Sequence, residues 1–276
     1  MISAVIPLRV TGDGRQALAR LRRVLRQMPE TITPVIADDT PDPGNRAAVA
    51  RIAASHSRAR HVVSDTSAGD PFSIGRLRDV GTQAAPDPIV LFHDVDFTAP
   101  PPFYHGLDRF VRDPAIADDP ANTLCVPVHF LTRGGTALYR LAPETTWRAL
   151  GAGYRRGLVD RLVKGSSAIL AHRETLLAEG GHDPGFVGHG AEDFELLHRL
   201  AKRYPRGPRP ANYHVDYGSR STTAEGFRAY FARYGQPPLD AGLALVHLWH
   251  PPRREDPRYQ ARRKTNFARL QAMLRE

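Results

Sequence analysis

The sequence has a single cysteine, Cys125, and no apolar run long enough to span a membrane. One cysteine excludes an intrachain disulfide and a cysteine-ligated zinc site. The first residues lack the basic segment and the long apolar core of a signal peptide. The sequence also contains no G-K-[ST] phosphate loop, no G-x-S-x-G elbow and no H-E-x-x-H helix. These absences predict a cytoplasmic protein and argue against P-loop, hydrolase and zinc-protease chemistry.

Acidic residues are the minority of the charged residues, with 29 Asp and Glu against 38 Lys and Arg. The basic residues gather at 148–164 and 253–264, without the interleaved aromatic residues of a surface that binds single-stranded nucleic acid. We therefore expect no nucleic-acid partner. The net charge of +9 leaves open a peripheral association with the inner face of the plasma membrane or with a biosynthetic complex.

Apolar segments alternate with helical patterns over the first third of the chain. Strands are expected at 4–8, 33–37, 61–63 and 88–92, and helices at 16–26, 46–57 and 74–83. This alternation predicts an α/β fold with a mostly parallel central sheet flanked by helices, whose ligands bind beyond the carboxyl ends of the strands. Four aspartates follow predicted strands: Asp38, Asp39, Asp94 and Asp96.

The rest of the chain is less regular. Further strands are expected at 124–131, 167–171 and 243–249, and helices at 173–179, 192–200 and 224–234. Residues 145–163 have the character of a basic helical or loop insertion, where a segment that covers a substrate is expected.

Two groups of side chains suit a divalent cation. Asp94 and Asp96 form a D-x-D pair directly behind the apolar run 89–91, and carboxylate oxygens are ligands for Mg2+ or Mn2+. His247 and His250 lie at the end of a predicted strand, where a turn would let both imidazoles reach one ion, and a mixed Asp and His set favours Mn2+. Each group taken alone also fits capping acids or structural histidines.

A glycine-rich segment precedes a helix with acidic residues in its first turn. Gly188 and Gly190 loosen the backbone, and Glu192 and Asp193 open the helix. A well-capped helix explains these acids by itself, because carboxylates are favoured at a helix N-terminus. Together with the D-x-D pair, however, they indicate a metal site with a catalytic base.

Four segments carry a resemblance to a known family. Residues 5–9 are similar to I-P-[FY]-R, 72–81 to F-N-R-A-x-x-x-N-V-G, 92–96 to F-x-D-V-D and 188–193 to G-W-G-G-E-D. In this order and spacing they resemble the inverting glycosyltransferases of the GT-A fold, of the bacterial capsule type whose C-terminal half is similar to beta-1,4-galactosyltransferases. The resemblance implies a single GT-A domain over 1–276, with a nucleotide-sugar-binding half at 1–98 and an acceptor and catalytic half at 99–276.

The resemblance also implies a reaction and its residues. The protein would be a metal-dependent inverting glycosyltransferase that moves a sugar from a UDP-sugar to a glycan hydroxyl, in capsular or other surface polysaccharide biosynthesis. Asp193 would be the general base, with Glu192 beside it holding hydroxyl groups. The Mn2+ or Mg2+ ligands would be Asp96, His250 and His247, the last in place of a methionine. The donor contacts would be Pro7, Arg9, Asp39, Phe72, Arg76 and Asp94.

Three departures from the family pattern leave the sugar open. His189 replaces a tryptophan, Ser166 and Ser167 replace two glycines, and Ile74 stands where an arginine is expected. The basic segment 148–164 has no counterpart in the pattern and would suit an acidic glycan acceptor. Three alternatives remain: a retaining GT-A enzyme of the polypeptide N-acetylgalactosaminyltransferase type, a nucleotidyltransferase, or a non-catalytic glycan-binding relative.

Overall fold

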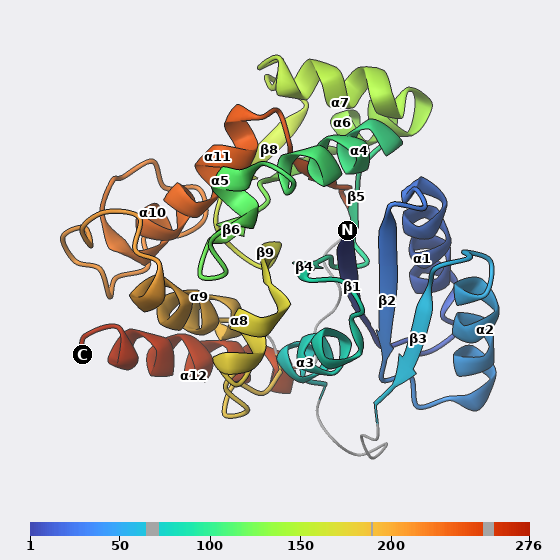
Figure 1. Cartoon of the computed structure of the whole chain (residues 1–276), viewed down its shortest axis with the longest axis horizontal. Coiled ribbons are helices and arrows are strands. Elements are labelled where there is room, and N and C mark those ends of the chain that lie inside the picture. The colour runs from blue at the N-terminus through green and yellow to red at the C-terminus, as the bar shows by residue number, and fades with distance from the viewer. Residues whose placement is uncertain (65–71, 189, 251–256) are drawn as a thin grey trace.

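A six-stranded sheet forms the centre of the protein. The structure is a computed structural model that describes residues 1–64, 72–188, 190–250 and 257–276, without the side chains of 257–261. The strand order is β3-β2-β1-β4-β9-β6, and the strands are β1 (Ile2–Leu8), β2 (Ile32–Asp38), β3 (Arg60–Val63), β4 (Ile89–Phe92), β6 (Thr123–Cys125) and β9 (Ile169–His172) (Figure 1). The first four of these strands are parallel, and β9 is antiparallel to both β4 and β6. The predicted α/β fold with a mostly parallel sheet is therefore confirmed.

Helices cover both faces of this sheet. Alternate residues of β1 pack with α1 (Arg15–Gln27) and α2 (Pro43–Ala53), as the spacing of buried leucines and valines in α1 requires. The opposite face of β1 packs against α3 (Ile74–Ala84), which approaches it closely. A Cβ on Gly81 would lie 2.3 Å from Cγ1 of Val5, so only glycine permits this approach. The close packing fixes α3 against this face of the sheet, next to the strand ends where the predicted site residues lie.

A smaller sheet lies beyond the carboxyl end of β4. Its order is β5-β10-β7-β8, with β5 (Phe97–Thr98), β10 (Leu245–His247), β7 (Val128–Leu131) and β8 (Val159–Val163). The prediction of one strand over 124–131 was wrong: the chain leaves the large sheet after Cys125 and enters the small one at Val128. Pro127 separates the two strands, because proline cannot donate a hydrogen bond to a central ladder.

The prediction that 145–163 is a helical or loop insertion was wrong in part, and the role of this segment in covering a substrate stays a prediction. Its first part belongs to α7 (Pro143–Gly151), and its last part is β8, which pairs with β7. Strand β8 is at the edge of the small sheet, and its charged residues Asp160 and Arg161 fit an edge strand that is in part exposed to solvent. The last strand, predicted at 243–249, is shorter and ends at His247.

The second half of the chain supplies the remaining helices: α4 (Pro101–Phe110), α5 (Pro114–Ala117), α6 (Arg133–Leu141), α8 (Arg173–Ala178), α9 (Glu192–Arg203), α10 (Gly226–Ala232), α11 (Gln236–Asp240) and α12 (Pro257–Met273). A 3-10 helix joins α10 to α11 at Arg233–Gly235. Helices α9 and α12 lie side by side at the lower left of Figure 1. Within the described residues, no helix has both the length and the apolar character needed to cross a membrane.

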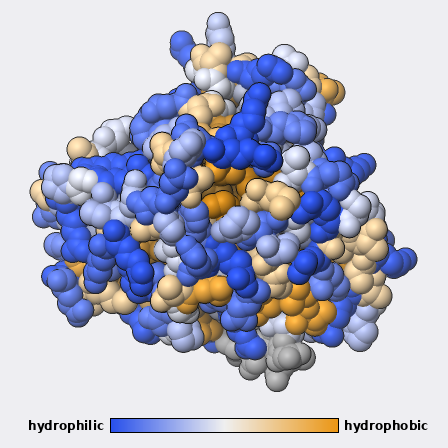
Figure 2. Space-filling view, in the orientation of Figure 1, coloured by the Kyte–Doolittle hydropathy of each residue, from blue (hydrophilic) through white to orange (hydrophobic). Residues whose placement is uncertain are grey.

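Hydrophilic residues cover most of the face shown in Figure 2, and apolar residues appear among them in separate patches.

Strands β6 and β9, from the second half of the chain, extend the sheet begun by the first half. The division at residue 98 stays a prediction.

Candidate active site

A buried arginine joins the two acidic groups that the sequence singles out. Arg78, on α3, places Nη2 2.8 Å from Oδ1 of Asp94 and Nη1 2.5 Å from Oδ1 of Asp193. Nη1 is also 3.8 Å from Oε1 of Glu192. The side chain of Arg78 is only 1% exposed. The loop after β4 and the start of α9 therefore meet around one guanidinium.

No sequence motif assigned a role to Arg78, although one signal was present. Arg78 lies at helical spacing with Gly75 and Gly81, which are both on the buried face of α3. A charged residue on such a face is rarely buried unless it is paired. Its position in the helical pattern thus pointed to buried partners, but the sequence could not say which.

The carboxylate of Asp94 is held at both of its oxygens. Arg78 donates to Oδ1, and the hydroxyl of Ser167 donates to Oδ2 over 3.1 Å. Both oxygens of Asp94 are thus already hydrogen-bonded within the protein, and its contact with a nucleotide stays a prediction.

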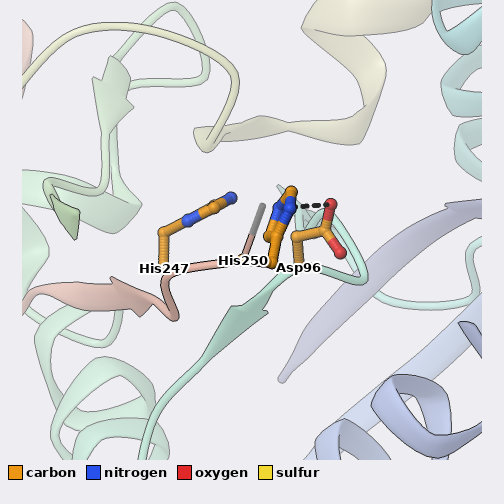
Figure 3. Close-up of side chains that lie close together, drawn as sticks. All are labelled: Asp96, His247 and His250. Carbon is orange, nitrogen blue, oxygen red and sulfur yellow. Dashed lines mark ion pairs between the residues drawn. The ribbon is translucent and has the colours of Figure 1, made fainter. Parts of the chain in front are cut away.

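The three predicted metal ligands lie together. One ligand atom from each of Asp96, His247 and His250 falls within 4.8 Å of the other two. Figure 3 shows the imidazole of His250 beside the carboxylate of Asp96, and Nε2 of His250 is 4.0 Å from Oδ2 of that residue. Antiparallel pairing of β5 with β10 places His247 opposite Phe97, the residue after Asp96. β10 ends at His247, and His250 follows three residues later with its imidazole near the same point.

The surroundings of these side chains suit Mn2+ or Mg2+. Burial, the largest effect, lowers the pKa of His247 to about 4 and so keeps its imidazole neutral, as metal binding requires. Its ring stacks on Phe130 with 4.6 Å between the ring centroids, which fixes its orientation. The Asp96 carboxylate is paired with Arg20 of α1. One oxygen and two imidazole nitrogens form a donor set that favours Mn2+.

The predicted donor contacts are only partly gathered. Nε of Arg9 donates to Oδ2 of Asp39 over 2.9 Å, and the Arg9 guanidinium lies 5.3 Å from the centre of the Phe72 ring. Pro7 is buried within β1, and Arg76 is exposed in the first turn of α3. The structure thus brings Arg9, Asp39 and Phe72 together at the ends of β1 and β2, and the roles of all the predicted contacts stay predictions.

Asp193 has the environment of a general base. Its side chain is 15% exposed, and burial, the largest effect, raises its pKa to about 7. The positive charge of Arg78 opposes this rise, whereas the negative charges of Glu192 and Asp94 add to it. Burial also raises the pKa of Glu192. A base is most effective when its pKa lies near the working pH, so Asp193 is matched to a reaction near neutrality.

The pH dependence of turnover tests this assignment. Because the base acts only when deprotonated, we expect kcat/KM to rise about tenfold per pH unit below a midpoint near the Asp193 pKa of about 7, and to level off above it. The measurement is a pH profile of kcat/KM at a fixed saturating Mn2+ concentration. A profile that is flat between about pH 5 and 8 would contradict a base with this pKa.

Residues with left-handed backbone conformation precede Asp193 and set its position at the start of α9. Gly188, Gly190 and Ala191 have φ angles of 84°, 95° and 77°, and the amide of Gly188 donates to the carbonyl of Phe72. This segment connects the start of α3 to the start of α9. Its remaining residue, His189, lies outside the described residues. Ala191 is the exception, because left-handed backbone normally favours glycine.

Replacing Ala191 by glycine is expected to raise the free energy of unfolding by about 1 kcal/mol, because it removes the strain that a Cβ causes at this φ. Urea unfolding measures the change. The matched control is Ala201→Gly in the interior of α9, which should lower the same quantity by about 1 kcal/mol. A loss of stability in Ala191→Gly equal to that of the control would show that position 191 carries no strain.

Comparison with known proteins adds three findings. The family model described as "Glycosyltransferase like family 2" matches residues 3–274. The mannosyltransferase PcManGT from Pyrobaculum calidifontis, solved with GDP-Man and Mn2+, is 16% identical with a TM-score of 0.53, over 100% of this chain and 64% of that one. This similarity confirms the predicted GT-A fold. No curated protein matches the chain.

Two other solved structures are more distant in shape. S. aureus TarS 1-349 in complex with UDP is 14% identical, with a TM-score of 0.48 over 73% of this chain and 55% of that one. Glucosyl-3-phosphoglycerate synthase from Mycobacterium tuberculosis, solved with Mn2+, UDP and glucosyl-3-phosphoglycerate, is 19% identical, with a TM-score of 0.40 over 74% and 66%. The chain spans 55% of the TarS fragment and 64% of PcManGT.

Proposed function

The chain belongs to the glycosyltransferase-like family 2, and from this membership we propose that it transfers a sugar from a UDP-sugar to a glycan hydroxyl with inversion at the anomeric carbon. One observation carries the proposal. The carboxylate of Asp193, only 15% exposed, is linked through Arg78 to Asp94, two residues from the candidate metal ligand Asp96. A base and a metal site on one edge of the sheet are the two groups that this reaction needs.

Asp193 performs the proton transfer in this scheme. The acceptor hydroxyl oxygen attacks the anomeric carbon while the bond from that carbon to the diphosphate oxygen breaks. The hydroxyl proton passes to Asp193, and the electron pair of the broken bond leaves with the nucleoside diphosphate. Attack from the face opposite the leaving group inverts the configuration. When bound by Asp96, His247 and His250, Mn2+ or Mg2+ would neutralise charge on the diphosphate.

The group of Arg9, Asp39 and Phe72 is proposed to hold the nucleoside. A carboxylate such as that of Asp39 can accept a hydrogen bond from the uracil imide N-H or from a ribose hydroxyl, and the Phe72 ring offers a face for stacking. Glu192, beside the base, is proposed to orient hydroxyl groups of the substrates. Binding of uridine and guanosine nucleotides tests this role of Arg9, Asp39 and Phe72, since the similar PcManGT was solved with GDP-Man.

The acceptor is proposed to be an acidic glycan of a capsule or another surface polysaccharide. Arg148 and Arg156 are exposed on the basic segment 148–164, although part of this segment is strand β8. The same basic surface would allow peripheral association with anionic lipid at the inner face of the plasma membrane, or with a biosynthetic complex.

A donor screen followed by product analysis tests the proposal. UDP-sugars and GDP-mannose are screened with Mn2+ by thermal shift, and nucleotide release is then measured with acidic glycan fragments. We expect one UDP-sugar to stabilise the protein and UDP to be released, with NMR showing a beta product from an alpha donor. Retained configuration would indicate the retaining type, pyrophosphate release a nucleotidyltransferase, and binding without release a non-catalytic relative.

A further inference from the structure

The guanidinium of Arg78 contacts acids from two other parts of the fold. Arg78 is anchored on α3, Asp94 follows β4, and Asp193 and Glu192 begin α9. Arg78 and Asp94 lie in the half of the chain predicted to bind the donor. Asp193 and Glu192 lie in the half predicted to bind the acceptor. No other described contact links the Asp94 and Asp193 carboxylates through one side chain.

The geometry of the contact is specific to arginine. The two terminal nitrogens of a guanidinium diverge in a rigid plane, and here each donates to a different carboxylate, at 2.8 Å and 2.5 Å. Lysine has the same charge but a single compact ammonium group at the end of a flexible chain. Within the described residues, Nε of Arg78 is buried without a hydrogen-bond partner. The side chain therefore satisfies the two carboxylates with its terminal nitrogens, while its Nε donor makes no hydrogen bond.

Neighbouring groups hold this arrangement in place. The Arg78 guanidinium lies 5.6 Å from the centre of the Phe92 ring, and Ser167 fixes the other oxygen of Asp94. Gly75, one turn earlier on α3, allows His182 to pack against the helix, where a Cβ would come within 2.9 Å of it. With α3 fixed against the sheet and Asp94 held at both oxygens, the position of Arg78 determines where Asp193 can lie.

We propose that Arg78 is a positioning residue, which holds the Asp193 carboxylate at the acceptor hydroxyl and keeps it in register with Asp94 on the donor side. The proposal rests on the proposed function, because it gives Asp193 the role of base. Arg78 does not touch the reacting atoms in this arrangement. Arg78 acts by orienting the Asp193 carboxylate and by stabilising its negative charge.

The charge of Arg78 gives this role a measurable consequence. The charged or titratable groups that face Asp193 are Arg78 from α3, Asp94 from the loop after β4, Glu192 from α9, His182 from the segment before α9 and the buried thiol of Cys125 from β6. Arg78 is the main cation among them, and a neighbouring arginine typically lowers a carboxyl pKa by about 1–3 units. Removing its charge should raise the Asp193 pKa by a similar amount, whereas moving the charge should mainly change orientation.

Two substitutions separate orientation from charge. Arg78→Lys keeps the charge and should lower kcat about 10- to 100-fold, with little change in the midpoint of the pH profile. Arg78→Met removes the charge and should also move that midpoint upward by about 1–3 units. The control is Arg173→Met, because Arg173 donates to the carbonyls of Thr82 and Gln83 at the end of α3 and contacts none of the acids. It should alter neither kcat nor the midpoint.

A second measurement does not depend on turnover. Carbon-13 NMR titration of aspartate carboxyl groups, with the Asp193 signal assigned by its loss in Asp193→Asn, reports the Asp193 pKa directly. If no sugar is transferred by the wild type, the proposed function fails, yet the titration still tests the contact. Arg78→Lys with a wild-type kcat and an unshifted Asp193 titration in Arg78→Met would overturn the proposal. Should Arg78→Met not fold, a wild-type kcat in Arg78→Lys overturns it alone.

Discussion

The Asp193→Asn variant is expected to lose sugar transfer by about 10²- to 10⁴-fold while it still binds the nucleotide. The amide keeps the size of the side chain, and its oxygen can still accept from Nη1 of Arg78, so the contact observed at 2.5 Å has a replacement. The amide cannot accept the proton of the acceptor hydroxyl. The expected signature is thus a fall in kcat with unchanged thermal stabilisation by UDP and Mn2+.

Nucleotide release and thermal shift measured on the same preparation test this outcome. The matched control is Asp183→Asn, in the segment before α9, where the aspartate accepts from the amide of Gly185 and pairs with Arg269. It makes the same chemical change outside the acidic cluster and should stay within about twofold of the wild-type rate. Transfer by Asp193→Asn at the rate of this control would remove Asp193 as the base.

The second large effect is expected at the metal ligands. Loss of a second-shell contact at a metal site typically costs about 10- to 100-fold in affinity, so loss of a direct ligand in His250→Ala should raise the Mn2+ concentration needed for half-maximal activity by more than about 100-fold. Asp96→Asn should act in the same direction, because a neutral amide is a weaker ligand than a carboxylate. It also leaves Arg20 without its charged partner.

Titration of activity with Mn2+ and with Mg2+, after removal of metal by a chelator, measures the effect. The control is His105→Ala, which removes an exposed imidazole from α4. Activity of the chelated wild type equal to that of the metal-supplemented enzyme would show that the reaction needs no divalent cation. Equal Mn2+ requirements in His250→Ala and His105→Ala would remove His250 from the ligand set.

Much of the fold could be predicted from the sequence because the relevant signals are local. The strands β1, β2, β3 and β4 and the helices between them follow from apolar periodicity, which short stretches of chain express by themselves. The errors lie where a distant partner decides the structure. Residues 124–131 are apolar except for His129, and only the separate pairing partners of β6 and β7 show that the chain changes sheets at Pro127.

The structure of the basic segment 145–163 is likewise decided by a distant partner that the local sequence does not reveal. Its charge suggested a helical or loop insertion, yet β8 pairs with β7, and Asp160 of that strand forms ion pairs with Arg161 and Arg220. An edge strand can carry charged residues on its exposed face and still belong to a sheet. Composition alone does not distinguish these two arrangements.

By itself, the sequence determined which side chains are available for chemistry: the acids that follow β4, the acids that open α9 and the histidines at the end of β10. Only the tertiary structure decided how they meet. Pairing of β5 with β10 brings His247 and His250 to Asp96, and packing of α3 against the sheet places Arg78 between Asp94 and Asp193. The physical reason is that a buried charge must find its partners in space, and those partners lie 16 and 115 residues away along the chain.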